Sequence, residues 1–150
     1  MKFVTYVENG KKAQRFGFVM EGHVVDVLRA AIFMNEENHE SEFLEIPSSL
    51  HACLEEWEPN LVKLQRLQDQ LANEHIADLI ANNQHVAQAE ADVQLLPPIT
   101  NPSTFRDFYA FEQHVRAARK LRGLDMHPDW FRLPIFYFSN PNALYGHGDD

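Results

Sequence analysis

Aromatic side chains are concentrated in the last third of this chain. Ten of its 17 Phe, Trp and Tyr residues lie between Phe105 and Tyr145. About 50 residues can rarely bury so many large rings, because so small a unit hides too small a fraction of its surface. We therefore expect this third to need the rest of the chain, a partner, or further chain to cover its apolar side chains.

The charge is distributed just as unevenly. The formal net charge of the 150 residues is −9, and residues 1–100 hold 7 basic and 16 acidic side chains, whereas residues 101–150 hold 6 of each. An acidic chain has no electrostatic attraction to nucleic acid or to an anionic membrane surface, so we expect neither as a partner. With the helix-stopping pair Pro97-Pro98 as the boundary, these differences predict an amino-terminal domain at 1–98 and the beginning of a second domain at 99–150.

The cysteine content and the amino-terminal residues point to a cytoplasmic protein. The only cysteine, Cys53, cannot form an internal disulfide, which fits a reducing compartment. Its helix-like surroundings favour a buried small apolar residue over a nucleophile. The first residues lack the apolar core of a signal peptide, and no window approaches 18 apolar residues. We therefore expect a soluble cytoplasmic chain without a membrane span.

The first 28 residues have the pattern of a small antiparallel meander. Strands are predicted at 3–7, 15–20 and 23–28, with Asn9-Gly10 and Glu21-Gly22 as the turns between them. The spacing of apolar residues then changes from two towards 3.6, which predicts helices with solvated loops between them.

The expected helices of the first part have these boundaries. A short helix with Leu28, Ala31 and Ile32 on its apolar face precedes an acidic loop at 35–42. The next helix starts at Pro47 with Ser48 or Ser49, has Leu50, Cys53, Leu54 and Trp57 on its apolar face, and ends at Pro59. Asn60 is the expected N-cap of a further helix with an apolar face of Leu61, Leu64, Leu67 and Leu71, and helical character continues to about Ala91 with breaks at Asn82 and Asn83. A short strand at 92–96 completes the part.

The second part is predicted to begin with a helix from Ser103 or Thr104 to Arg122, followed by a buried strand at 133–138. The expected fold class is therefore α+β. Because no further strand follows in sequence to pair with 133–138, the second part looks truncated.

One constellation of polar residues in this predicted helix is suited to chemistry. Asp107 and His114 would share one helix face about 10 Å apart along the axis. A substrate or a metal-bound ligand could lie between them, with the carboxylate as a hard oxygen ligand and the imidazole as a base. The alternative is an ordinary amphipathic helix with a capping Asp. The basic cluster of Arg116, Arg119, Lys120 and Arg122 has two readings as well, an anion-binding site or a solvated helix face.

Three blocks in the last third share their order and spacing with a known family. They read RDFYAFEQH at 106–114, MHPDW at 126–130 and LPIFYFSNP at 133–141, and they resemble the fumarylacetoacetate hydrolase family. The segment GHGD at 146–149 is similar to the family's Gly-x-Gly-Asp turn, and residues 1–98 more loosely resemble its small amino-terminal domain. The resemblance implies that a small meander with helices precedes the first helix and strand of a mixed β-roll.

The resemblance also implies functional residues. Asp107 matches the family's first metal ligand, which holds Mg²⁺ or Ca²⁺, with Mn²⁺ as a third option. Tyr109 and Tyr137 match substrate-binding tyrosines, and His114 matches the general base that activates water for attack on a carbonyl carbon.

The substrate-binding arginine of the family has a less direct counterpart. It falls near Arg122, one residue short of a gapless match, and Arg119 is the alternative.

The implied activity is metal-dependent hydrolysis of a carbon–carbon bond in a β-diketo acid similar to fumarylacetoacetate or an acylpyruvate. Decarboxylation of an oxaloacetate-like 2-oxo acid is the alternative within the family, and a non-catalytic interaction module is the alternative outside it. The family takes its remaining metal ligands from a Glu-x-Glu pair and an Asp downstream of the Gly-Asp turn, where this sequence stops. We therefore expect no metal-dependent turnover from residues 1–150 alone, and a homodimer or the missing carboxy-terminal part as partner.

Overall fold

The computed structural model describes residues 1–39, 41–74, 76–81 and 85–149. The chain divides into two compact units, which we call unit 1 (Met1–Thr100 with Tyr145–Asp150) and unit 2 (Asn101–Leu144). The helical breaks expected at Asn82 and Asn83 lie outside the described residues. None of the helices in the described ranges is both long and apolar enough to cross a membrane.

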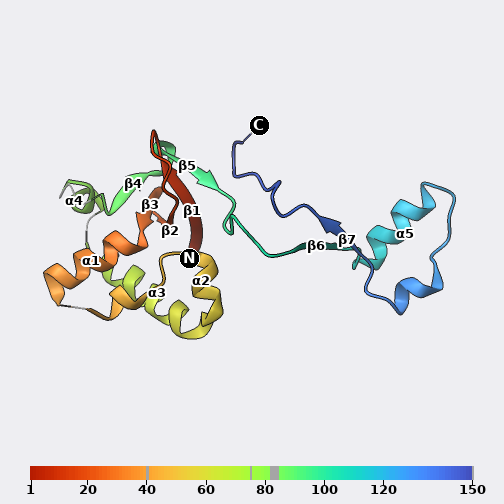
Figure 1. The fold of residues 1–150 in the computed structure, drawn as a ribbon, viewed down its shortest axis with the longest axis horizontal. Helices are drawn as coiled ribbons and strands as arrows, with labels where there is room; N and C mark the ends of the chain where they lie inside the picture. Colours follow the sequence, from red (N-terminus) through yellow and green to blue (C-terminus); the bar gives the residue numbers. More distant parts are fainter. Residues whose placement is uncertain (40, 75, 82–84, 150) are drawn as a thin grey trace. The chain divides into compact units, whose positions relative to one another are not determined.

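Unit 1 is built on a curled antiparallel sheet of five strands in the order β4-β3-β2-β1-β5 (Figure 1). Its strands are β1 (Lys2–Glu8), β2 (Arg15–Met20), β3 (His23–Asp26), β4 (Ala87–Ala89) and β5 (Val93–Leu96). The first three strands form the predicted meander, and Gly10 and Gly22 have φ angles of 77° and 75° in its turns. The α+β class expected for this part is thus confirmed. The stretch before β5 was expected to stay helical, but it forms β4 because residues 87–89 pair with β3.

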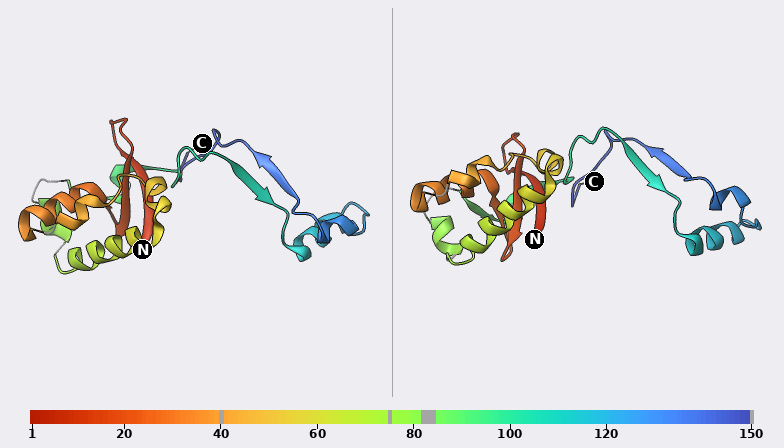
Figure 2. Two further views of the ribbon diagram at one scale, coloured as in Figure 1. Left: turned by 60° about the horizontal axis from the view of Figure 1, so that its bottom comes forward. Right: turned by 90° about the horizontal axis from the view of Figure 1, so that it is seen from below.

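Helices cover one face of this sheet, as the two views of Figure 2 show. They are α1 (Val27–Asn38), α2 (Leu50–Glu55), α3 (Trp57–Leu71) and α4 (Ile76–Ala81), with short 3-10 helices η1 (Ser41–Glu45) and η2 (Glu90–Asp92). Of the two serines expected to start this helix, Ser48 and Ser49, it is Ser49 that caps α2, since its side chain accepts a hydrogen bond from the backbone N–H of Ala52.

Two helix boundaries differ from expectation. Helix α1 runs through part of the predicted acidic loop, and its buried face carries Val27, Ala30, Ala31 and Met34, whereas Leu28 and Ile32 are exposed. Helix α3 begins before Pro59, which is tolerated in a first turn because those backbone N–H groups have no partner within the helix. Asn60 is therefore not an N-cap. It is buried, and its Nδ2 donates to the carbonyl oxygen of Cys53 over 3.2 Å.

The strands bury apolar residues on both faces of the sheet. Phe16, Phe18 and Val25 face the helices and pack with Leu64, Leu67 and Leu71 of α3 in the larger core. The opposite, inner face of the curl carries a smaller cluster of Val4, Tyr6, Val24 and Val93. Cys53 belongs to the larger core, as expected, and burial raises the pKa of its thiol to about 11.

Gly17 shows how closely the inner face is packed. A Cβ at this position would lie 2.4 Å from the carbonyl oxygen of Val25 and 3.3 Å from the ring of Tyr6. Because Gly17 has no side chain, β2 and β3 can approach each other closely at the inner face of the curled sheet.

A buried ionic network joins three strands and helix α1. Asp26 is 1% exposed, and its carboxylate accepts hydrogen bonds from Tyr6 Oη (2.7 Å), Arg15 Nη2 (2.9 Å) and Arg15 Nε (2.5 Å). It also caps α1 by accepting from the backbone N–H of Arg29 at 2.9 Å. Burial, together with the nearby carboxylate, raises the pKa of Tyr6 well above its usual range, so the phenol stays protonated and keeps donating.

Glu8 forms a second buried ionic contact, at the end of β1. Its side chain is 7% exposed and pairs with Lys11, with Arg29 Nη1 at 2.5 Å, and with Gln88 Nε2 at 3.3 Å. These contacts tie β1 to α1 and β4. The hydrogen bond from Lys11, with support from Arg29, lowers the pKa of Glu8 from 4.5 to about 2.

This depressed pKa predicts acid sensitivity of unit 1. Because the folded pKa lies below the unfolded one, the contribution of Glu8 is complete above pH 4.5 and disappears as the pH falls through about 2. In urea unfolding at pH 6 and pH 3, we expect Glu8 to account for about 1–2 kcal/mol of the loss in unfolding free energy. The Glu8→Gln variant should lack this part of the loss. An identical pH dependence in both proteins would contradict the prediction.

Unit 2 is a two-stranded antiparallel sheet with one helix. It contains β6 (Phe105–Phe108), α5 (Glu112–Lys120), the 3-10 helix η3 (Pro128–Phe131) and β7 (Phe136–Ser139). The single helix predicted from Ser103 or Thr104 to Arg122 is wrong, because its first part is strand β6. The strand predicted at 133–138 is shifted to 136–139, and it is not left without a partner, since it pairs with β6.

Unit 2 has almost no core of its own. Of its residues, only Val115 is buried. Ten large apolar side chains are exposed in it, namely Phe105, Phe108, Phe111, Leu121, Leu124, Phe131, Leu133, Ile135, Tyr137 and Phe138. The excess of rings noted in the sequence is therefore not covered by unit 2 itself.

Candidate active site

The pairing of β6 with β7 brings several of the predicted site residues together. Tyr109 follows β6 directly, and its ring lies edge-on to the ring of His114, with 6.1 Å between their centroids. The same ring meets that of Tyr137 on β7 at 6.3 Å and an interplanar angle of 72°. Tyr109 is thus in contact with both of the other two rings, and we call Tyr109, His114 and Tyr137 the ring cluster.

The backbone around Tyr109 is fixed from two sides. Its N–H donates to the carbonyl oxygen of Ile135 at 3.0 Å, which extends the pairing of the two strands by one bond. Its own carbonyl oxygen accepts from Trp130 Nε1 at 2.8 Å. Trp130, in the predicted MHPDW block, therefore positions the ring cluster, a contribution that sequence reasoning missed.

Asp107 lies beside this cluster in the register of the sheet. It pairs with Tyr137 across the strands, and its side chain is exposed. The expectation that Asp107 and His114 share a helix face is wrong, because Asp107 is in β6 and His114 is in the first turn of α5. The register of the sheet places Asp107 opposite Tyr137, and the segment 109–111 leads from β6 into α5 so that His114 lies beside Tyr109.

The two arginines proposed for substrate binding are held at the other end of α5. Arg119 Nε donates to the carbonyl oxygen of Asp125 at 2.5 Å, and Arg122 Nε donates to that of Ala118 at 3.2 Å. Arg116 pairs with Glu112 at 2.6 Å and lies over the ring of Phe131. The three arginines of the basic cluster therefore make local contacts at the helix, and the hydrogen bonds of Arg119 and Arg122 do not involve the ring cluster.

The described residues do not fit a metal site on their own. Asp107 offers a carboxylate of the kind that Mg²⁺ and Ca²⁺ prefer. However, among the residues that the structure describes, no group of three or more His, Cys, Asp or Glu side chains is placed to hold a metal ion.

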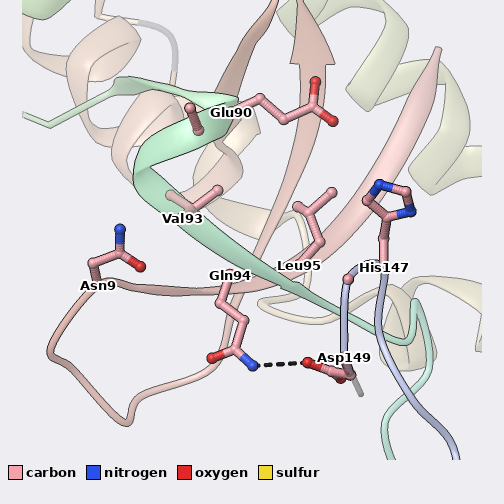
Figure 3. Close-up of a pocket in the computed structure, with 9 residues that line it drawn as sticks. Asn9, Glu90, Val93, Gln94, Leu95, His147 and Asp149 are labelled. Atoms are coloured by element: carbon pink, nitrogen blue, oxygen red, sulfur yellow. Dashed lines mark hydrogen bonds between the residues drawn. The ribbon is translucent and has the colours of Figure 1, made fainter.

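An open hollow of about 600 Å³ lies in unit 1, and none of the predicted site residues lines it (Figure 3). Its lining includes Glu90, Gln94, His147 and Asp149, and Gln94 Nε2 donates to Asp149 Oδ1 at 3.0 Å. The hydrogen bond between Gln94 and Asp149 links residues 145–149 to β5.

Comparison with known proteins adds nothing to the resemblance, which rests on the sequence blocks at 106–114, 126–130 and 133–141. No family model matches the chain, and no curated protein matches it either.

Proposed function

We propose that this chain carries part of the active site of a hydrolase similar to the fumarylacetoacetate hydrolase family, acting on a β-diketo acid. The observation that supports this best is the ring cluster. Tyr109 and His114 come from one sequence block and Tyr137 from another, and the ring of Tyr109 lies 6.1 Å from that of His114 and 6.3 Å from that of Tyr137, between centroids. A base beside one phenol, with a second phenol next to the first, suits a substrate rich in carbonyl and carboxylate oxygens.

Each residue has a task that its chemistry allows. The phenol groups of Tyr109 and Tyr137 donate hydrogen bonds to the substrate's oxygens and fix its orientation. His114 removes a proton from water as the water oxygen attacks a carbonyl carbon. The adjacent carbon–carbon bond then breaks, its electron pair passes to the enolate, and the enolate takes up the proton. The products are a carboxylic acid and a keto acid.

A divalent ion of the Mg²⁺ or Ca²⁺ type would polarise the substrate's oxygens when bound, with Asp107 as one ligand. Since the described residues supply too few ligands, the others must come from residues outside the described set or from another chain. The roles proposed above for Tyr109, Tyr137 and His114 are those of the side chains themselves, without that ion.

The test is turnover of a small substrate panel by the protein expressed from its complete coding sequence. A set of 3-acylpyruvates should be hydrolysed to pyruvate and the matching carboxylic acid, while release of CO₂ from oxaloacetate would favour the related decarboxylase. We expect residues 1–150 alone to be inactive, because Asp107 belongs to no group of three metal-binding side chains among the residues that the structure describes. Absence of both reactions from the complete protein would contradict the proposal.

The second candidate is a non-catalytic interaction module, and the exposed apolar surface of unit 2 favours it. Ten large apolar side chains exposed within one small unit are typical of an interface. Native mass measurement distinguishes the two candidates: a stable 17.4 kDa monomer would favour the module, whereas a longer chain or a homodimer would favour the enzyme.

A further inference from the structure

Residues 145–149, which we call the strap, lie against strand β5 at the edge of the sheet of unit 1 (Figure 3). Gly146 makes the closest approach. A Cβ at this position would lie 2.0 Å from the carbonyl oxygen of Leu95 and 2.9 Å from the Cα of Leu96. The φ of Gly146 is not in the left-handed region, so lack of space, and not backbone conformation, requires glycine there.

Asp149 fastens the strap in two ways. Its Oδ1 accepts from Gln94 Nε2 at 3.0 Å, which links the strap to β5. Its Oδ2 accepts from the backbone N–H of Gly146 at 2.7 Å, which closes the turn of the strap on itself. One carboxylate therefore both shapes the strap and attaches it.

The strap returns the chain to unit 1 after the excursion through unit 2. Residues 101–144 leave after Thr100 and come back at Tyr145, and within them only Val115 is buried. An isolated two-stranded hairpin is marginally stable at best in water, and the only buried side chain of unit 2 is that of Val115 in its helix. A restriction of the chain at both ends of unit 2 would therefore favour its order.

We propose that the strap is a clamp that closes the 101–144 excursion and thereby keeps the ring cluster of unit 2 ordered. Fixing both ends of a segment lowers the entropy of its open states, which favours its folded state without any added contact inside it. Gly146, Gln94 and Asp149 are positioning residues in this sense. The clamp concerns order alone, so it holds whether or not the ring cluster catalyses the proposed reaction.

Hydrogen exchange measured by mass spectrometry tests the clamp in the whole chain. In the Gly146→Val variant, amides of β6, α5 and β7 should exchange about tenfold faster than in the wild type, while those of β2 and α1 keep their rates. The His147→Ala variant, which changes an exposed strap side chain, should exchange like the wild type. Wild-type rates in unit 2 of the valine variant would overturn the clamp, whether or not the strap amides exchange faster.

A cross-linked variant covers the case in which the valine variant fails to fold. Gln94→Cys with Asp149→Cys replaces the hydrogen bond by a disulfide, and the buried Cys53 is not accessible to compete. Unit 2 should be protected in the oxidised form and should exchange about tenfold faster after reduction. Equal exchange in the two forms would overturn the clamp independently of any activity measurement.

Discussion

Replacing Asp26 by alanine is expected to lower the free energy of unfolding of unit 1 by about 3–5 kcal/mol. The substitution leaves the Arg15 guanidinium and the Tyr6 hydroxyl without the carboxylate that accepts their hydrogen bonds, in a part of the fold where Asp26 is 1% exposed. It also removes the cap of helix α1. Since small domains are stable by only about 5–15 kcal/mol, such a loss is a large fraction of the total.

Urea unfolding followed by circular dichroism measures this loss, with two further variants for comparison. Asp26→Asn keeps a capping oxygen but loses the charge, so it should be destabilised less than the alanine variant. Glu42→Gln disrupts the exposed ion pair with Arg66 and should change stability by less than about 1 kcal/mol. If Asp26→Ala behaved like Glu42→Gln, the network would not be a main support of unit 1.

Replacing His114 by asparagine is expected to lower kcat of the complete protein about 10²- to 10⁴-fold on an acylpyruvate that it hydrolyses. Asparagine is close to histidine in size but cannot take up a proton from water. KM should change little, because the tyrosines that we propose as substrate-binding residues remain.

A control on the same helix separates loss of the proposed base from a general effect on α5. Gln113→Ala, an exposed neighbour on the same helix, is the matched control and should keep wild-type kcat. A kcat for His114→Asn within about threefold of the wild type would exclude His114 as the general base.

The meander was predictable from sequence because its signals are local. Strands 15–20 and 23–26 alternate between the two faces of the sheet, and glycines with positive φ mark both turns. Ser49 was predictable as a cap for the same reason, since a capping side chain acts on the next three residues.

The elements that depend on distant partners were predicted less well. Phe105, Phe108 and Phe111 recur at helical spacing, yet residues 105–108 form a strand because the apolar β7 offers pairing some 30 residues later. Aromatic residues also favour strands, and that signal in the FRDFYAF stretch could have indicated β6. Pairing across strands overrode the local period.

The sequence suggested the residues of the candidate site but not how they lie relative to one another. The sequence blocks suggested Tyr109, His114 and Tyr137, and the structure places these rings in succession. It was the strand pairing, unseen in the sequence, that put Asp107 opposite Tyr137. The anchoring of Tyr109 by Trp130 depends on a backbone carbonyl, for which no sequence pattern exists.

The tight curl around Gly17 limits what unit 1 can do. Many curled sheets are hollow and carry a small molecule inside, but here the interior is occupied by the chain's own side chains, and even one methyl group at position 17 would collide with the backbone of Val25. This face of the sheet is therefore part of the packed interior of unit 1, and any side chain at position 17 would force β2 and β3 apart.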